Sequence, residues 1–315
     1  MQEPSTPSVS VVVPTCDRGA LLARTVRSVL AQRGVALEVI VVDDGSADDT
    51  AATLAGFDDR RLTLLRHPRR QGVSVARNTG IAAASGGWVA FLDDDDLWAP
   101  DKLAGQVEAA ERLGRAWACS GSVSFTETPR GGLRIVAGTP PPPAERIVER
   151  LPRRNAVPAG ASNVLVRADA LRTAGGFDPV LRHMADWDLW IRLARLGPPA
   201  VVPEPAVAYR LHTGNASRDS DVVDHEITYI EARLGAGVDR AFAHRWAAWN
   251  LLRAGRRLAA MSAYARALAS GDLVSVGRAA VALVHPGIVH RTLTRHGADA
   301  AWIARAEAWL RALPA

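Results

Sequence analysis

Lysine is nearly absent from this chain of 315 residues: Lys102 is its single lysine, although Lys and Arg together number 38. Enzymes that move a nucleotidyl group from a triphosphate are expected to carry a Gly-rich phosphate loop with a lysine. The scarcity of lysine therefore counts against a nucleotidyltransferase. Cysteine is scarce too, because only Cys16 and Cys119 are present, and the chain holds no Cys-x-x-Cys or Cys/His run, which excludes the usual zinc sites.

Long apolar runs are also missing. No stretch reaches the roughly 18 apolar residues that cross a bilayer, so the sequence predicts no transmembrane helix. The opening residues, MQEPSTPSVS, hold no basic region followed by an apolar run, so we expect no signal peptide. These absences predict a cytoplasmic protein, with peripheral contact to the inner face of the cell membrane as an alternative.

The net charge of +5 is unevenly placed. Residues 241–315 hold ten Arg and three acidic residues, so the first 240 residues carry a net charge of −2. The most clustered charges of this first part are acidic, and they repel phosphates unless a cation intervenes. We therefore predict no nucleic-acid partner.

Short apolar runs rich in Val, Ile and Leu alternate with amphipathic segments in the first third of the chain. The runs are Val9–Val13, Leu37–Val42, Leu62–Leu65 and Trp88–Leu92. Continuous apolar character is typical of parallel strands that helices cover on both faces. The segments between the runs have helical spacing of apolar residues, and they are Ala20–Gln32, Asp48–Leu54 and Ser74–Ala84. This alternation predicts an α/β fold with a Rossmann-like, doubly wound, mostly parallel sheet.

The pattern changes after a predicted helix at Lys102–Leu113. Strand-like pieces at Ala116–Phe125 and Leu133–Ala137 precede a Pro-rich segment, Gly138–Ala144, which we interpret as a surface loop. Residues 163–209 then return to strand, helix and strand.

From about Asp221 onward the chain has helical character, rich in Ala, Arg and Trp. We therefore predict an α/β domain over residues 1–220, made of the halves 8–115 and 116–220. A helical C-terminal region is predicted over residues 221–315.

Polar, mostly acidic residues follow three of the predicted strands. They are Thr15 and Asp17, then Asp43 and Asp44, then Asp93–Asp96. In open α/β sheets, ligands bind outside the carboxyl ends of the strands. The fold is therefore expected to bring all three groups to one edge of the sheet.

The strongest local signal is the run FLDDDD, Phe91–Asp96. Four adjacent carboxylates in a partly buried cleft cannot all stay ionised without a counter-charge, because repulsion and desolvation raise their pKa values. A divalent cation answers this need, and carboxylate ligands with a diphosphate partner suit Mg²⁺ or Mn²⁺. A solvated acidic loop or a helix cap is the alternative.

Asp43 and Asp44 end the second predicted strand, and Gly45 allows a tight turn after them. Asp44 is placed to accept hydrogen bonds from a nucleobase or a ribose. The alternative is helix capping by Ser46 and Asp48.

Five segments of the chain, in this order and spacing, resemble family 2 glycosyltransferases with the GT-A fold. They are VSVVVPTCDR (Val9–Arg18), VVDDGSADDT (Val41–Thr50), QGVSVARNTGI (Gln71–Ile81), WVAFLDDDDLWAPDKL (Trp88–Leu103) and GGFDPVLRHMADWDLWIRLA (Gly175–Ala194). The resemblance covers roughly residues 8–215. It implies that residues 8–115 bind a nucleotide sugar, which we expect to be UDP-linked, and that residues 116–220 bind the acceptor.

The resemblance also implies roles for individual residues. The residues implied for the donor nucleotide are Pro14, Thr15, Asp17, Asp44, Arg77, Asp93 and Asp94. The residues implied for the metal, Mg²⁺ or Mn²⁺, are Asp95, Asp93 and His212, with Asp95 as the most direct ligand and Asp94 or Asp96 assisting. Asp94 stands where the family often has a small residue.

Asp186, in ADWDLW, matches the position of the catalytic base of the family. Ala185 stands where an acidic residue often precedes that Asp, which raises Asp188 as an alternative. At about 100° per residue, Asp188 points away from Asp186 on a helix. We therefore expect an inverting transfer with Asp186 as the base. Negative charge at a helix N-terminus is the structural alternative for both acids.

The acceptor is expected to be a glycan, a lipid-linked sugar or a small molecule. A nucleotide-sugar-binding protein without activity is a further alternative, although it has no use for Asp186. The C-terminal helices, with Arg253, Arg256 and Arg257 near Leu258, offer a basic amphipathic surface for anionic lipid. We favour packing of these arginines and of the neighbouring tryptophans against the first domain or the second subunit of a homodimer.

Overall fold

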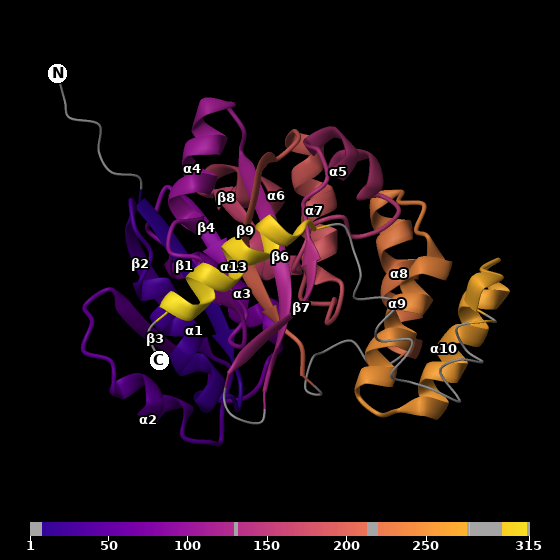
Figure 1. Ribbon diagram of the computed structural model, residues 1–315, viewed down its shortest axis with the longest axis horizontal. Helices are drawn as coiled ribbons and strands as arrows, with labels where there is room; N and C mark the ends of the chain where they lie inside the picture. Colours follow the sequence, from indigo (N-terminus) through magenta and orange to yellow (C-terminus); the bar gives the residue numbers. More distant parts are fainter. Residues whose placement is uncertain (1–7, 129–131, 213–219, 276, 278–297, 314–315) are drawn as a thin grey trace.

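The computed structural model describes residues 8–128, 132–212, 220–275, 277 and 298–313. Its centre is one sheet with the strand order β3-β2-β1-β4-β8-β6-β9-β5, and β7 pairs with β6 (Figure 1). The strands are β1 (Ser8–Thr15), β2 (Ala36–Asp43), β3 (Leu62–Arg66), β4 (Trp88–Phe91), β5 (Leu97–Trp98), β6 (Trp117–Glu127), β7 (Leu133–Thr139), β8 (Leu165–Arg167) and β9 (Ala200–Arg210).

Helices cover both faces of the sheet. In chain order they are α1 (Gly19–Leu30), α2 (Thr50–Ala55), α3 (Val73–Ala83), α4 (Lys102–Arg112), α5 (Ala144–Arg150), the 3₁₀ turn η1 (Gly160–Asn163), α6 (Ala168–Ala174), α7 (Ala185–Leu196), α8 (Ser220–Leu234), α9 (Arg240–Arg253), α10 (Arg257–Ala269) and α13 (Ala300–Ala312). Alternate side chains of β1 point to opposite faces of the sheet. Val11 and Val13 share a core with Leu22 of α1, whereas Val12 lies against Gly80 of α3.

The prediction of a doubly wound, mostly parallel sheet is confirmed. β3, β2, β1 and β4 run parallel to one another, and each lies within two residues of the apolar run that predicted it. In the second half β6 and β9 are parallel, while β8, β7 and β5 join antiparallel. Several elements were not predicted. They are β5, which has only two residues, α5, which begins at the end of the expected surface loop, and η1, and two helices, α6 and α7, stand where one was expected.

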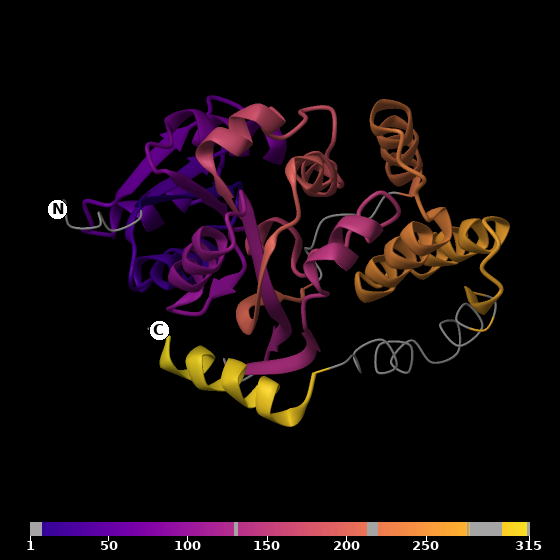
Figure 2. The ribbon, with the colours of Figure 1, turned by 90° about the horizontal axis from the view of Figure 1, so that it is seen from above.

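The C-terminal helices occupy two different places. Figures 1 and 2 show α8, α9 and α10 grouped at one end of the molecule, whereas α13 lies against the strands of the second half. Trp302 Nε1 donates to the carbonyl of Pro203 at 2.9 Å, and Trp309 Nε1 donates to that of Pro205 at 2.7 Å. Packing against the first domain is therefore confirmed for these two tryptophans.

The start of α10 lies at the surface. Arg256 and Arg257 are exposed there, and Leu258 is 87% exposed. Among the described residues, no helix is both long enough and apolar enough to pass through a bilayer. Contact of this surface with anionic lipid stays a prediction, as do the homodimer and the division of the chain at residue 220.

Candidate active site

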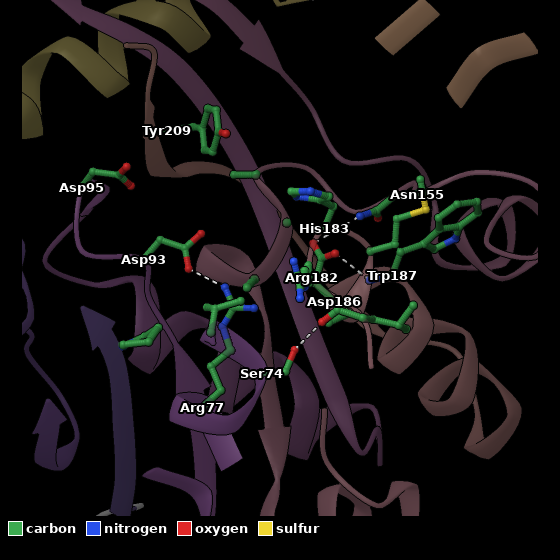
Figure 3. A pocket seen from close by; sticks show the side chains of 18 of the residues that line it. Ser74, Arg77, Asp93, Asp95, Asn155, Arg182, His183, Asp186, Trp187 and Tyr209 are labelled. Carbon is green, nitrogen blue, oxygen red and sulfur yellow. Dashed lines mark hydrogen bonds and ion pairs between the residues drawn. The ribbon is translucent and has the colours of Figure 1, made fainter. Parts of the chain in front are cut away.

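A cavity of about 940 Å³ opens at the edge of the sheet where β1, β2 and β4 end. Eight residues that the sequence analysis singled out line it: Pro14, Thr15, Asp44, Arg77, Asp93, Asp94, Asp95 and Asp186. Figure 3 shows Asp93, Asp95, Arg77 and Asp186 around this space. The structure therefore brings together acids from three distant stretches of the chain.

Asp44 follows β2 and organises the segment that leads into α3. Its Oδ1 accepts hydrogen bonds from the backbone of Gln71 and from His67 Nδ1, both at 2.8 Å, and its Oδ2 accepts from the backbone of Gly72 at 2.7 Å. One lone pair of Oδ2 remains able to accept a bond from a ligand. His67 was missed by the sequence analysis, although it follows the end of β3 as Asp44 follows β2.

Asp17 does not line the cavity. It is exposed with φ 55°, its Oδ1 accepts from the backbone of Ala47 at 2.7 Å, and its backbone donates to Ser46 Oγ at 2.9 Å. These bonds join the loops that follow β1 and β2. The expectation that Ser46 caps a helix is wrong, because its hydroxyl accepts from Asp17 and α2 begins only at Thr50.

The turn after β2 requires a glycine. Gly45 has φ 77°, and a Cβ on it would lie 2.7 Å from the carbonyl carbon of Arg69. The predicted tight turn is confirmed. It allows the chain near Arg69 to pass close to the end of β2 and to present the backbone of Gln71 and Gly72 to Asp44.

The four acids of the Asp93–Asp96 run have different partners. Arg77 binds Asp93 at 2.6 Å, and Thr15 Oγ1 donates to Asp94 at 2.7 Å. Arg18 and His212 also contact this run. Arg18 Nη1 lies 3.0 Å from Asp94 Oδ1 and 2.7 Å from Asp95 Oδ2, and His212 Nε2 lies 2.8 Å from the same Asp95 oxygen.

Asp96 is buried away from the cavity. Its Oδ2 accepts from the Ser162 hydroxyl at 2.5 Å, and its Oδ1 accepts from the backbone of Arg210 at 2.8 Å. It therefore joins β9 to η1. Burial raises the pKa of Asp96 well above its ordinary value, and the neighbouring Asp95 and Asp93 add to this. Burial likewise raises the pKa of Asp94 to about 7, although the Arg18 guanidinium opposes the shift. Both directions agree with the expectation that four adjacent carboxylates do not all stay ionised.

The donor atoms at this edge suit a hard divalent cation only in part. Among the residues that the structure describes, no three His, Cys, Asp or Glu side chains are grouped so that they could hold a metal ion. Asp95 and His212 do converge, with 2.8 Å between the carboxylate oxygen and the imidazole nitrogen. Mg²⁺ is commonly held by one or two carboxylates together with substrate phosphates and water. The residues therefore fit Mg²⁺ or Mn²⁺ when a phosphate-bearing ligand completes the shell.

Asp186 stands at the first turn of α7 and lines the cavity. Its Oδ1 accepts from the backbone of Trp187 at 2.7 Å, and its Oδ2 lies 3.4 Å from Asn155 Nδ2 (Figure 3). Burial raises the pKa of Asp186 to about 6, while Arg77 opposes this shift and Asp93 adds to it. A carboxylate of this pKa is ionised at neutral pH and can accept a proton.

Asp188 has a structural position. It is buried, and it forms ion pairs with Arg192 of its own helix and, at 3.0 Å, with Arg233 of α8. Its side chain therefore joins α7 to α8 and does not line the cavity.

Glu226 of α8 was missed by the sequence analysis. It is 2% exposed, and its two oxygens accept from the backbone of Arg182 at 2.6 Å, of His183 at 3.2 and 3.1 Å, and of Met184 at 2.9 Å. These residues form the loop before Asp186. Glu226 therefore holds the N-terminus of α7 in place from a different helix, and no local motif marks it.

The C-terminal region contributes a further wall to the cavity. Phe242, Trp246 and Trp249 of α9 line it, and so do Arg154 and Arg182. Trp246 is 38% exposed, and the Arg154 guanidinium lies 5.4 Å from the centre of the Phe242 ring. Aromatic faces and guanidinium groups together suit a sugar ring that carries an anionic group.

Comparison with known sequences adds a second kind of evidence. The sequence profile described as "Glycosyl transferase family 2" matches residues 10–174. The succinoglycan biosynthesis protein ExoO of Rhizobium meliloti is 33% identical over 260 residues, covering 76% of this chain and 69% of that protein. WfgD of Escherichia coli, a UDP-Glc:alpha-D-GlcNAc-diphosphoundecaprenol beta-1,3-glucosyltransferase, is 37% identical over 99 residues, covering 31% of this chain and 39% of that protein.

Solved structures share the fold. TarS 1-349 of S. aureus in complex with UDP-GlcNAc aligns with a TM-score of 0.56 at 15% identity, covering 97% of this chain and 92% of that one. The mannosyltransferase PcManGT of Pyrobaculum calidifontis, in complex with GDP-Man and Mn²⁺, aligns with a TM-score of 0.51 at 21% identity, covering 98% and 91%. The expected GT-A architecture is confirmed.

Proposed function

Because this chain belongs to glycosyl transferase family 2, we propose that its cavity transfers a sugar, with inversion, from a nucleoside diphosphate sugar to an acceptor hydroxyl. The observation that carries the proposal is the meeting of Asp44, Asp95 and Asp186 around one space. UDP is the proposed nucleoside diphosphate, and the UDP-GlcNAc in the TarS complex supports it.

The donor side is assigned to the strand ends. Pro14, Thr15 and Asp44 hold the nucleoside, and Asp17 acts through the loop that borders them. Arg77 and Asp93 are assigned to the sugar, because Arg77 pairs with Asp93 and its charge also acts on Asp186. Asp94 is the last of the residues proposed to bind the donor.

Asp95, with Asp93 and His212 nearby, would hold Mg²⁺ or Mn²⁺ together with the diphosphate. The cation would supply charge stabilisation to the departing phosphate oxygen. The Mn²⁺ in the mannosyltransferase structure supports this part of the proposal.

Asp186 is the proposed base. The acceptor oxygen forms a bond to the anomeric carbon, the bond from that carbon to the diphosphate oxygen breaks, and the hydroxyl proton passes to a carboxylate oxygen of Asp186. Its bond from the backbone of Trp187 fixes one oxygen. The other oxygen, beside Asn155 and Gly160, is left to face the acceptor.

The α9 wall is the proposed acceptor side. It lies in the same cavity as Asp186, and its Phe242, Trp246 and Trp249 can stack on a sugar ring. The diphosphoundecaprenol-linked acceptor of WfgD supports a glycan or lipid-linked acceptor here. Arg256, Arg257 and Leu258 would then offer peripheral contact to the membrane that holds such a lipid.

A donor screen tests the proposal. UDP-, GDP- and dTDP-sugars are added to the full chain with and without Mn²⁺, and thermal stability and sugar transfer are measured, because a ligand that binds only the folded state raises the melting temperature. We expect one donor to stabilise the protein with Mn²⁺ and to yield a glycosylated product. Asp95→Ala should lose the Mn²⁺-dependent shift, and the exposed Asp58→Ala should keep it. Binding without transfer to any acceptor would indicate a binding protein, and nucleotidyl transfer from a triphosphate would indicate a nucleotidyltransferase.

A further inference from the structure

Arg18 occupies the position of a counter-ion in the acidic cluster. Its Nη1 contacts Asp94 Oδ1 at 3.0 Å and Asp95 Oδ2 at 2.7 Å, and it lines the cavity. Its side chain is 30% exposed, whereas those of Asp94 and Asp95 are 7% and 6% exposed. One cation at the end of a long side chain from the β1–α1 loop therefore contacts two nearly buried carboxylates.

This position conflicts with a divalent cation on the same carboxylate. Asp95 Oδ2 already faces both Arg18 Nη1 and His212 Nε2. A metal ion at the usual distance of about 2.1 Å from that oxygen would lie less than about 5 Å from the guanidinium nitrogen. Two positive charges so close in a shielded site repel each other strongly unless anions are added between them.

The phosphates of a donor would remove this conflict. A diphosphate adds several negative charges to the cavity, and a guanidinium binds phosphate oxygens through two parallel hydrogen bonds as readily as it binds a carboxylate. Arg18 has the exposure to turn toward the cavity, and Asp94 keeps its hydrogen bond from Thr15 when it does so.

We propose that Arg18 is the resident counter-ion of Asp94 and Asp95, and that a divalent cation binds only together with the donor diphosphate, onto which Arg18 transfers. The proposal rests on the assignment of this edge to a nucleoside diphosphate sugar. It makes Arg18 a positioning residue that sets the order of binding, because the protein does not take up the metal ion before the donor is present. It also gives the extra acid at position 94 a role, because Asp94 keeps Arg18 at the cluster before the donor arrives.

Titration of the metal-free full chain with MnCl₂, followed by electron paramagnetic resonance, tests this order directly. Without nucleotide we expect wild type to bind Mn²⁺ at least tenfold more weakly than Arg18→Gln, and to reach tight binding when UDP or GDP is added. Arg18→Lys keeps the positive charge and should behave like wild type. Arg24→Gln is the matched control, since Arg24 also belongs to this part of the chain but pairs with Glu127, outside the cavity. Equal Mn²⁺ affinity of wild type and Arg18→Gln without nucleotide would overturn the proposal.

The effect of MnCl₂ on thermal stability gives a second readout, which a merely structural arginine would not change. Arg18→Gln should melt at a lower temperature than wild type without metal, and MnCl₂ alone should restore the variant while leaving wild type unchanged. If Arg18→Gln does not fold, the double variant Arg18→Gln/Asp94→Ala removes the extra acid together with its counter-ion, and it too should bind Mn²⁺ alone. Neither readout needs a sugar or an acceptor. A protein that shows this Mn²⁺ behaviour but transfers no sugar would therefore refute the proposed function and leave the role of Arg18 standing.

Discussion

The proposed donor side and the proposed acceptor side of the cavity are held together in different ways. On the donor side, Asp44 and Asp93–Asp95 follow the ends of β2 and β4, the two strands that flank β1, and short loops supply most of their partners. On the acceptor side, Asp186 depends on Asn155 and on a loop that Glu226 anchors from α8. The donor side is therefore organised by the sheet itself, and the acceptor side by helices that pack onto it.

The two sides also differ in the cations that contact their carboxylates. Arg77 forms its ion pair with Asp93 at 2.6 Å, so Asp186 is left with a weaker charge interaction from the same arginine. Asp93, Asp94 and Asp95 each have an arginine in contact, whereas Asp186 has a backbone N–H and an amide. Burial raises the pKa of Asp186 to about 6, which suits the proposed general base, because such a carboxylate is ionised at neutral pH and can accept a proton.

The largest expected effect comes from removing that base. Asp186→Asn should keep the shape of the site and the binding of donor but lose transfer by about 10² to 10⁴ in kcat. Because the base must be ionised, and its pKa is raised to about 6, wild-type kcat should fall as the pH drops below about 6. Steady-state kinetics across pH 5–8 and donor titration of the variant, with about 0.1 M salt, measure both effects.

Asp188→Asn is the counterpart that sharpens this comparison. Asp188 pairs with Arg192 and Arg233 away from the cavity, so its loss should lower the melting temperature and leave the pH dependence of kcat intact. Asp186→Asn should do the reverse. An acid whose pKa is raised on folding destabilises the folded protein as the pH rises through the range from about 4 to about 6. Asp186→Asn should therefore raise the melting temperature at pH 8 and leave it unchanged at pH 3. Wild-type transfer by Asp186→Asn would remove the assignment of the base.

A smaller loss is expected when the neighbour of the base is enlarged. Gly160 has φ +52°, and a Cβ on it would lie 2.7 Å from Asp186 Oδ2. Gly160→Ala should push the carboxylate aside, and a displacement of about 1 Å can lower kcat by about 10²-fold. Gly175→Ala is the control, since Gly175 has φ +84° with open space around it. Both variants should lose about 1 kcal/mol of stability from backbone strain. Equal kcat values for the two variants would show that Asp186 does not need its present position.

Replacing Glu226, which anchors the loop before α7, should mainly lower the free energy of unfolding. Glu226→Gln replaces one acceptor oxygen by an NH₂ group that faces a backbone N–H, and losing a buried, charge-assisted hydrogen bond of this kind costs about 3 kcal/mol. kcat should fall as well, because the loop carries the start of α7. Glu231→Gln, which removes a partly exposed pair with Arg240, should cost less than about 1 kcal/mol. Urea denaturation of both variants measures the difference, and similar losses would mean that Glu226 is no special anchor.

The same contrast explains what could be predicted from the sequence. The first four strands were predictable because buried parallel strands are apolar throughout, and the acids Asp44 and Asp93–Asp95 were predictable because ligand residues follow strand ends. The resemblance to a family located Asp186. Each of these signals is carried by runs of consecutive residues.

Other parts of the site carry no such local signal. Glu226 lies 44 residues after the backbone of Arg182 that it binds, and Arg18 lies 76 residues before Asp94. The aromatic wall of α9 is set by how that helix packs, and its composition alone suits a lipid surface equally well. Asp96 resembles its neighbours in sequence, and only the fold shows that it faces Ser162 and β9 instead of the cavity.

The smallest effect is expected from the aromatic wall of α9. Comparing Trp246 of this wall with Trp302 of α13 distinguishes a role in binding from a role in packing. Trp246 is 38% exposed in the cavity, and loss of a stacking contact worth about 1 kcal/mol should raise the KM for the acceptor about fivefold without changing donor binding. Trp302 is 6% exposed and packs on Gly121 and Gly138, so Trp302→Ala should cost about 3 to 5 kcal/mol of stability. Acceptor kinetics and thermal melting of the two alanine variants decide between the roles. If Trp246→Ala changes only the melting temperature, α9 is a packing element and the acceptor side must lie closer to β9.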